Sequence, residues 1–98
     1  MLGGIDGFDW DEGNRSKCRI HGVSQAEIEF IFQQAPLIAP DPMHSVAEQR
    51  LIAVGRNEEG RPLFIAFTLR ERGGKSFIRP VSARYMHKKE ITRYEARS

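Results

Sequence analysis

The stretch SFIRPVSARYMHKKEITRYE, residues 76–95, decides the fold of this chain. Its first part, residues 76–83, is predicted to be a strand that places arginines among apolar residues. Its second part is predicted to be a basic helix from about Met86 to Arg97. A strand that carries arginines and leads into a cationic helix is suited to holding phosphate, because guanidinium groups pair with phosphate oxygens and stay charged.

The charge of the chain is concentrated around this stretch. The whole chain has a net charge of +2, but residues 70–98 hold nine Lys/Arg and three Glu, a net charge of +6. The other 69 residues hold six basic and ten acidic side chains, a net charge of −4. A segment this basic can attract a nucleic-acid backbone or an acidic protein partner, although a solvated cationic helix face has the same composition.

The strand at residues 76–83 is predicted to be the last of three that follow one another closely. Residues 50–56 and 63–69 have apolar side chains at both odd and even positions, which predicts interior strands covered on two sides. Residues 57–60 form a predicted hairpin loop, and Gly73-Gly74 a second tight turn. The three strands are therefore predicted to form a C-terminal meander.

Two helices are predicted before the meander. Ser24 and Glu27 form a capping box, which predicts a helix start, and an earlier helix begins at Asp9 or Asp11 and ends before Gly22. Short strands are expected at residues 8–10 and 37–39, and residues 1–7 are expected to fray. One face of the second helix is predicted to lie in the core, at Ile28, Ile31, Phe32 and Ala35. The remaining predicted core residues are Val23, Leu51, Val54, Ile65, Phe67 and Val81.

Helices grouped before and after an antiparallel sheet predict an α+β fold, with two N-terminal helices and one C-terminal helix. At 98 residues the chain is expected to be one domain, residues 1–98. It has no apolar run near the roughly 20 residues of a spanning helix, so we expect no membrane contact and a cytoplasmic location. Its single cysteine, Cys18, cannot form an internal disulfide. Cys18 and His21 lack the second ligand pair of a structural zinc site, so we expect no metal and no cofactor.

Four blocks of the sequence together resemble the BrnT family, small ribonuclease toxins of type II toxin–antitoxin systems. The blocks are FDWD at residues 8–11, HGVS at 21–24, DPMHS at 41–45 with Glu48 and Arg50, and RPVSAR at 79–84 with Glu90 and Tyr94-Glu95. There are two departures from the family pattern. Ile20 replaces a lysine that commonly precedes His-Gly, and Pro80 interrupts a run that is usually Arg-Ile-Ile-Ser-Ala-Arg.

The resemblance implies a fold like that of RelE and an endoribonuclease that cleaves cellular RNA. It also implies a cognate antitoxin, a small DNA-binding protein similar to BrnA, which is expected to be dimeric. Metal-free RNA cleavage needs a base for the 2′-hydroxyl, cations for the charged phosphorane and an acid for the leaving 5′-oxygen. Arg79 and Arg84 are the first candidates for the cations and Arg50 is the third, and the resemblance favours all three.

The base and the acid have several candidates. Glu48 and Arg50 have the same parity, so at the start of a strand they are expected to project together, either as a catalytic pair or as a structural ion pair. His44 can exchange protons near neutral pH, and the DPMHS match favours a functional role for it over that of a surface histidine. On the last helix, Lys88, Lys89 and Arg93 are expected to contact RNA. Tyr94 is expected either to stack on a base or to dock the helix on the sheet.

The alternative function is a nucleic-acid-binding or protein-binding module without catalysis, since the same basic segment would serve it. Incubation with RNA in the presence of a chelator separates the two functions: a catalyst shortens the RNA, whereas a binder only retards it.

Overall fold

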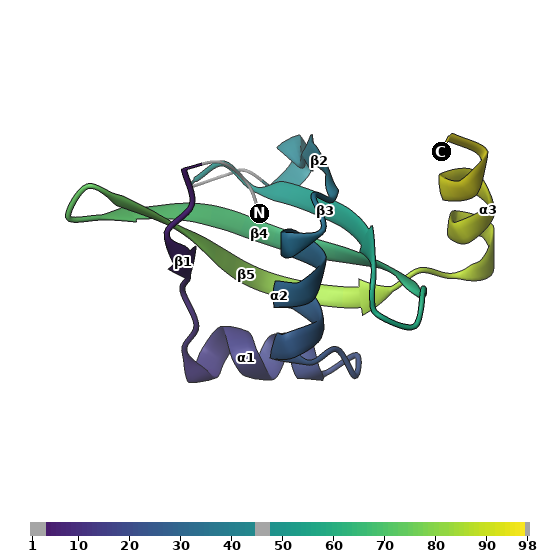
Figure 1. The fold of residues 1–98 in the computed structure, drawn as a ribbon, viewed down its shortest axis with the longest axis horizontal. Coiled ribbons are helices and arrows are strands. Elements are labelled where there is room, and N and C mark those ends of the chain that lie inside the picture. The colour runs from purple at the N-terminus through teal and green to yellow at the C-terminus, as the bar shows by residue number, and fades with distance from the viewer. Residues whose placement is uncertain (1–3, 45–47, 98) are drawn as a thin grey trace.

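The computed structural model describes residues 4–44 and 48–97. In these residues a five-stranded sheet carries two helices on one face, and a third helix lies beyond one end of the sheet (Figure 1). The elements along the chain are β1 (Gly7–Phe8), α1 (Glu12–Arg19), α2 (Gln25–Gln33), β2 (Leu37–Pro40), the 3₁₀ turn η1 (Pro42–His44), β3 (Leu51–Arg56), β4 (Pro62–Arg72), β5 (Lys75–Tyr85) and α3 (Lys88–Arg97). This arrangement confirms the predicted α+β class.

The sheet has the order β1-β5-β4-β3-β2. Strands β3, β4 and β5 form the predicted antiparallel meander, and β2 adds to it antiparallel to β3. The prediction of a wholly antiparallel sheet is wrong at one edge, because β1 pairs parallel to β5 through Gly7 and Phe8. Strands β1 and β2 lie at opposite edges of the sheet, and the two helices between them connect these edges. Because β1 and β5 are not joined by a tight turn, they can pair in the parallel direction.

The N-terminal segment is tied to β5 before β1 begins. The backbone N–H of Asp6 donates to the carbonyl of Ser76 at 2.7 Å, and the N–H of Ser76 donates to the Asp6 carboxylate at 2.8 Å. Residues 1–3 of the segment that we expected to fray lie outside the described residues, whereas Asp6 is hydrogen-bonded to β5 and Gly7 begins β1.

Both predicted helix starts are present. The Ser24 hydroxyl accepts from the N–H of Glu27 at 3.1 Å, and the Glu27 carboxylate accepts from the N–H of Ser24 at 3.0 Å. Asp11, rather than Asp9, caps α1, and it forms a second capping box with Asn14. Local side-chain contacts of this kind satisfy backbone N–H groups that have no partner inside the helix, so the sequence alone locates them.

The end of α2 differs from the prediction. Ala35 was expected on the buried face, but α2 ends at Gln33 and Ala35 is exposed with a φ of 52°. The following Pro36 disfavours a helical conformation at the residue before it, so the chain leaves the helix before Ala35 can reach the core.

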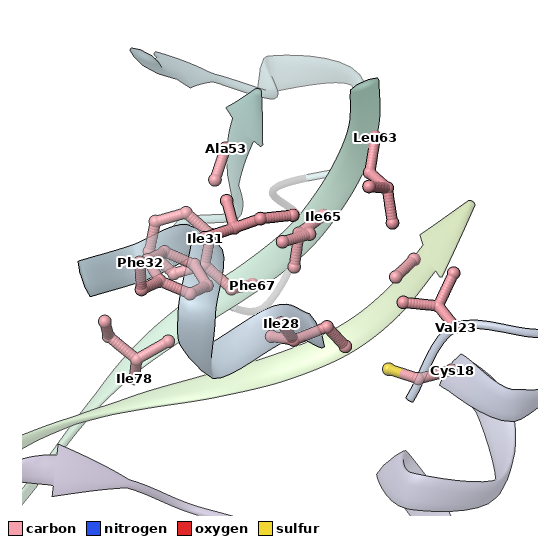
Figure 2. Packing of buried hydrophobic residues seen from close by; sticks show 11 residues of the cluster. Cys18, Val23, Ile28, Ile31, Phe32, Ala53, Leu63, Ile65, Phe67 and Ile78 are labelled. Carbon is pink, nitrogen blue, oxygen red and sulfur yellow. The ribbon is translucent and has the colours of Figure 1, made fainter. Parts of the chain in front are cut away.

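The core lies between the two helices and one face of the sheet (Figure 2). Phe32 of α2 is completely buried, and its ring meets that of Phe67 on β4 edge to face, with 5.0 Å between centroids. Of the β4 residues, Leu63, Ile65 and Phe67 belong to this core, and their alternation along the strand identifies the face of the sheet that the helices cover. The buried cluster consists of Cys18, Val23, Ile28, Ile31, Phe32, Ala53, Leu63, Ile65, Phe67, Ile78 and Ala83.

The opposite face of the sheet, here called the outer face, has no helix of the described chain packed along it (Figure 1). The prediction that both β3 and β4 are covered on two sides holds for residues 65–68 of β4, which are buried at odd and even positions alike, whereas β3 is only partly buried on its outer face. Three residues predicted for the core are only partly buried: Leu51, which packs against the buried cluster, Val54 and Val81. Val54 pairs with Phe64 on the outer face, and Val81 lies at an irregularity in β5. No helix of the described residues is long and apolar enough to cross a membrane.

Candidate functional site

The predicted cations meet on the outer face because of a β-bulge in β5. Arg79 and Arg84 are five residues apart, so a regular strand would place them on opposite faces. Thr68 of β4 pairs with Arg79, Ala66 pairs with Ser82, and the register shifts between Ala66 and Phe67. Val81 is the extra residue of the bulge, and it restores Arg84 to the face that holds Arg79.

Pro80 is accommodated at this bulge. Its carbonyl accepts a hydrogen bond from Asn14 Nδ2 in α1 at 2.8 Å, in a buried position. Because the N–H and C=O of one strand residue point to the same side, the N–H that proline lacks would have faced α1 rather than the β4 ladder. The departure from the family pattern at Pro80 therefore leaves the pairing of β5 with β4 in place.

A hollow of about 360 Å³ opens on the outer face beside the bulge. It brings together two of the three predicted cations, Arg50 and Arg84, although the first precedes β3 and the second lies near the end of β5. Its floor comes from the sheet, at Ile52, Phe64 and Ala66. The other lining residues are His21, Asp41, Ser82 and Ala83. An open, partly polar hollow with two guanidinium groups can receive a phosphodiester.

Arg84 is paired with Glu90 of α3 in a bidentate contact. Nη1 donates to Oε1 at 2.9 Å and Nη2 donates to Oε2 at 2.8 Å. The guanidinium also lies over the Phe64 ring, 4.7 Å from its centroid. The Arg84 hydrogen bonds, followed by the His87 N–H, lower the pKa of Glu90 to about 2, so the carboxylate is ionised at neutral pH.

Arg79 is on the same face but is held by the N-terminal segment. Its Nη2 lies 2.9 Å from Asp11 Oδ2, and its Nη1 lies 3.7 Å from Asp9 Oδ2. The Asn14 backbone N–H and the Arg79 guanidinium hold the pKa of Asp11 below its usual value. Arg79 is not among the described residues that line the hollow, so the structure separates it from Arg50 and Arg84.

The structure pairs Glu48 with Arg70. Glu48 precedes β3 instead of starting it, and its carboxylate accepts from Arg70 Nη2 at 2.9 Å. The parity argument required a strand at residue 48, but β3 begins at Leu51. His44 ends the turn η1, and its side chain and Ser45 lie outside the described part of the chain.

The predicted RNA contacts of α3 are exposed. Lys88, Lys89 and Arg93 are all on the surface. Tyr94 is half-buried, and the Arg56 guanidinium lies 5.2 Å from the centroid of its ring. A second hollow of about 600 Å³ lies between α3 and the sheet, and Tyr94 is among its lining residues. Its lining is Leu37, Ala39, Val54, Phe64, Met86, Glu90, Arg93, Tyr94 and Ala96.

Two groups able to transfer protons, His21 and Asp41, line the first hollow but were not among the predicted site residues. In the sequence, His21 drew attention only as a possible metal ligand beside Cys18. Cys18 is buried, and burial raises the pKa of its thiol to about 11. Both residues lie in blocks that carry the family resemblance, and this was the signal that could have selected them.

A comparison with curated proteins gave no match. A family model does match, that of the ribonuclease toxin BrnT of type II toxin–antitoxin systems, and it covers residues 10–90. This range includes Arg50, Arg79, Arg84 and Glu90. It also includes His21 and Asp41, the two lining residues that were not predicted. The resemblance stated from the four sequence blocks is thereby confirmed, and the chain belongs to the BrnT family of ribonuclease toxins.

Proposed function

We propose that this toxin cleaves cellular RNA by metal-free phosphoryl transfer in the hollow on the outer face. The observation that carries the proposal is that Arg50 and Arg84, from distant parts of the sequence, line one hollow on the uncovered side of the sheet. A sheet face without a helix leaves room for an extended RNA strand. The family's ribonuclease activity supplies the reaction class, and the likeness of the fold to RelE remains part of this proposal.

The reaction that fits these residues is an attack of the RNA 2′-oxygen on the phosphorus of the adjacent 3′-phosphate. A bond forms between the 2′-oxygen and phosphorus, the bond from phosphorus to the 5′-oxygen breaks, and one proton moves from the first oxygen to the second. Arg50 and Arg84 stabilise the added negative charge of the phosphorane, because their guanidinium groups stay cationic and can each bind two oxygens. Arg79 binds a neighbouring phosphate of the same strand.

The proton transfers have four candidate groups. Glu48 and His44 are favoured by the resemblance, and His21 and Asp41 by their place in the hollow. The ion pair of Glu48 with Arg70 argues against Glu48, because a base that serves this hollow would have to leave that contact. We assign the proton transfers to His21 and Asp41, because both line the hollow and an imidazole can both accept and donate a proton near neutral pH.

RNA is guided to the hollow by α3. Lys88, Lys89 and Arg93 are exposed there, whereas the two acidic residues of the helix, Glu90 and Glu95, are paired with Arg84 and Arg56. The exposed charge of α3 is therefore basic and can attract the phosphate backbone. Tyr94 contributes an aromatic surface at the end of the same helix.

The same basic surface suits the antitoxin that a type II toxin requires. We propose that the antitoxin is a small, dimeric, DNA-binding protein similar to BrnA, which covers α3 with acidic and apolar side chains. The apolar lining of the second hollow, at Leu37, Val54 and Phe64, supports the apolar part of that contact. Covering α3 would block access of RNA and shield the basic charge in one step.

The purified toxin, incubated with RNA in the presence of EDTA, tests the proposal. We expect shorter RNA fragments with the wild type, and greatly slowed but measurable cleavage with Arg84→Ala or Arg50→Ala. His21→Gln should cleave more slowly by about 10²–10⁴-fold, the usual contribution of a general acid or base, while still binding RNA. Glu48→Gln should cleave at close to the wild-type rate.

Arg19→Ala is the matched control, because Arg19 is also an exposed arginine paired with a glutamate, but it lies on α1 across the sheet. It should leave cleavage unchanged. RNA that is retarded but not shortened by the wild type would support a binding module and contradict the proposal. Full activity of both Arg84→Ala and Arg50→Ala would place the site elsewhere.

A further inference from the structure

The guanidinium of Arg84 is held in one orientation by contacts from three sides. Glu90 binds the end of the guanidinium through both Nη atoms, at 2.9 and 2.8 Å. Nη1 also donates to the backbone carbonyl of Tyr85 at 3.3 Å, and the guanidinium carbon of Arg84 lies over the Phe64 ring. A long side chain on an open sheet face would otherwise sample many rotamers, so these contacts remove freedom that a phosphate would have to remove on binding.

Glu90 is itself fixed by the start of α3. Its Oε1 accepts from the backbone N–H of His87 at 2.8 Å, just before the first helical residue, Lys88. The carboxylate is thus held by the first turn of the helix on one side and by the guanidinium on the other. The position of α3 and the orientation of Arg84 are therefore coupled through one side chain.

The contacts leave one edge of the guanidinium available. A guanidinium has five N–H donors, and the contacts with described residues use three of them, two on Nη1 and one on Nη2. The remaining donors are the Nε–H and the outer N–H of Nη2. These two are parallel and form the second edge by which arginine binds two oxygens of a phosphate.

We propose that Glu90 is a positioning residue for the cleavage reaction: it holds Arg84 against Phe64 so that the Nε–Nη2 edge is presented to the scissile phosphate. This inference rests on the proposed function of the hollow. Glu90 does not touch the substrate, and it acts only through Arg84. If Glu90 instead blocked Arg84 and had to be displaced by RNA, removal of the Glu90 carboxylate would raise kcat.

Glu90→Gln is the variant that tests the proposal. Glutamine keeps an oxygen that can accept from the His87 N–H, so α3 can still start at the same residue, but the charge and one of the two bonds to Arg84 are lost. We expect kcat for cleavage of a short RNA to fall about 10–100-fold, as for other misplaced catalytic groups, with KM changed less than about threefold. Circular dichroism of the variant checks that the helix is retained.

Glu95→Gln is the matched control. Glu95 lies on the same helix and also pairs with an arginine of the sheet, Arg56, at 3.1 Å, but Arg56 is not among the described residues that line the hollow. It should leave kcat within about twofold of the wild type. An equal loss of kcat in both variants would mean that Glu90 only stabilises α3, and a gain of kcat in Glu90→Gln would mean that it blocks Arg84. Either result overturns the proposal.

Two further measurements separate this inference from the function on which it rests. In an Arg84→Ala background, Glu90→Gln should cause no additional loss of kcat, and an additive loss would contradict an action through Arg84. The side-chain NMR signals of Arg84 report its orientation without any catalysis. We expect separate Nη proton signals in the wild type and averaged ones in Glu90→Gln. Identical signals in the two proteins would overturn the positioning role even if the wild type cleaves RNA. Different signals together with a wild type that fails to cleave RNA would show that Glu90 orients Arg84 and would refute the proposed cleavage.

Discussion

At the level of single residues, the arginines that could bind phosphate are already paired with carboxylates of the same chain. Arg79 is paired with Asp11, Arg84 with Glu90, and Arg70 with Glu48. The charge of residues 70–98 is therefore partly neutralised by acidic residues from earlier in the sequence. A count of charges along the chain could not show this, because Asp9, Asp11 and Glu48 are brought to β4 and β5 only by the fold.

The residues that the sequence predicted best are those whose contacts are local. Ser24 and Glu27 are three positions apart, and their mutual capping follows from that spacing alone. Asn14 was not predicted, although it is buried and joins α1 to the carbonyl of Pro80, 66 positions away. Only the assembled fold brings these two groups together, so no pattern near Asn14 in the sequence indicated its role.

Phe32 is expected to be the residue whose truncation costs the core most. It has no exposed surface, and it contacts the rings of Phe67 and Phe8, with centroids 5.0 and 5.9 Å away. Phe32→Ala should lower the free energy of unfolding by about 3–5 kcal/mol, from lost burial and a residual cavity. Chemical denaturation measures the change. Phe30→Ala, at a partly buried position of the same helix, should cost less, and a loss below about 1 kcal/mol for Phe32→Ala would mean that α2 is not packed on the sheet.

At the level of elements, the sequence predicted which segments form helices and strands better than it predicted their faces. The glycine turn at Gly73-Gly74 and the Ser24–Glu27 capping box are where we expected them, and Asp11 is one of the two caps expected for the first helix. The bulge at Val81 was not predicted, because the apolar residues around it fit a regular strand equally well. Because Val81 is left unpaired at the bulge, Arg79 and Arg84 share a face although they are five positions apart, so the geometry of the site depends on a feature that periodicity does not reveal.

The bulge allows a test by deletion and insertion. Deletion of Val81 should leave the pairs of Phe67 with Pro80 and of Ala66 with Ser82 in register, and should keep both arginines on the outer face. Insertion of one alanine between Ala83 and Arg84 should turn Arg84 toward α2, because a shift of one residue reverses every side chain that follows.

We expect the deletion variant to retain RNA cleavage and the insertion variant to lose it. An arginine turned into the core without a partner should also lower the free energy of unfolding by about 3–5 kcal/mol in the insertion variant. RNA cleavage assays and thermal melts of the two variants, side by side, measure both effects. Cleavage that is lost on deletion and kept on insertion would show that the outer face is not where the arginines act.

For the whole molecule, the basic segment of the sequence is not one surface in space. The molecule measures 41 × 25 × 24 Å, and the tip of the β4–β5 hairpin lies at one end of its long axis while α3 lies at the other (Figure 1). Arg70, Arg72 and Lys75 belong to the hairpin end, and Lys88, Lys89 and Arg93 to the α3 end. The two hairpin arginines are paired with Glu48 and Asp9, so the α3 end holds the basic side chains most available to a partner.

This separation makes the position of the antitoxin testable by charge reversal. Exposed charges around an interface mainly set the rate of encounter, so association with the antitoxin should slow as salt is added. Changing Lys88, Lys89 and Arg93 to Glu should lower the association rate constant by about tenfold or more and change the dissociation rate much less. Changing Arg70, Arg72 and Lys75 to Glu alters the net charge equally, but at the hairpin end, and should leave association within about twofold of the wild type. Stopped-flow binding at low and high salt distinguishes the two variants. Equal effects would mean that the antitoxin responds only to net charge, and a larger effect of the hairpin variant would place the antitoxin at the opposite end of the molecule from α3.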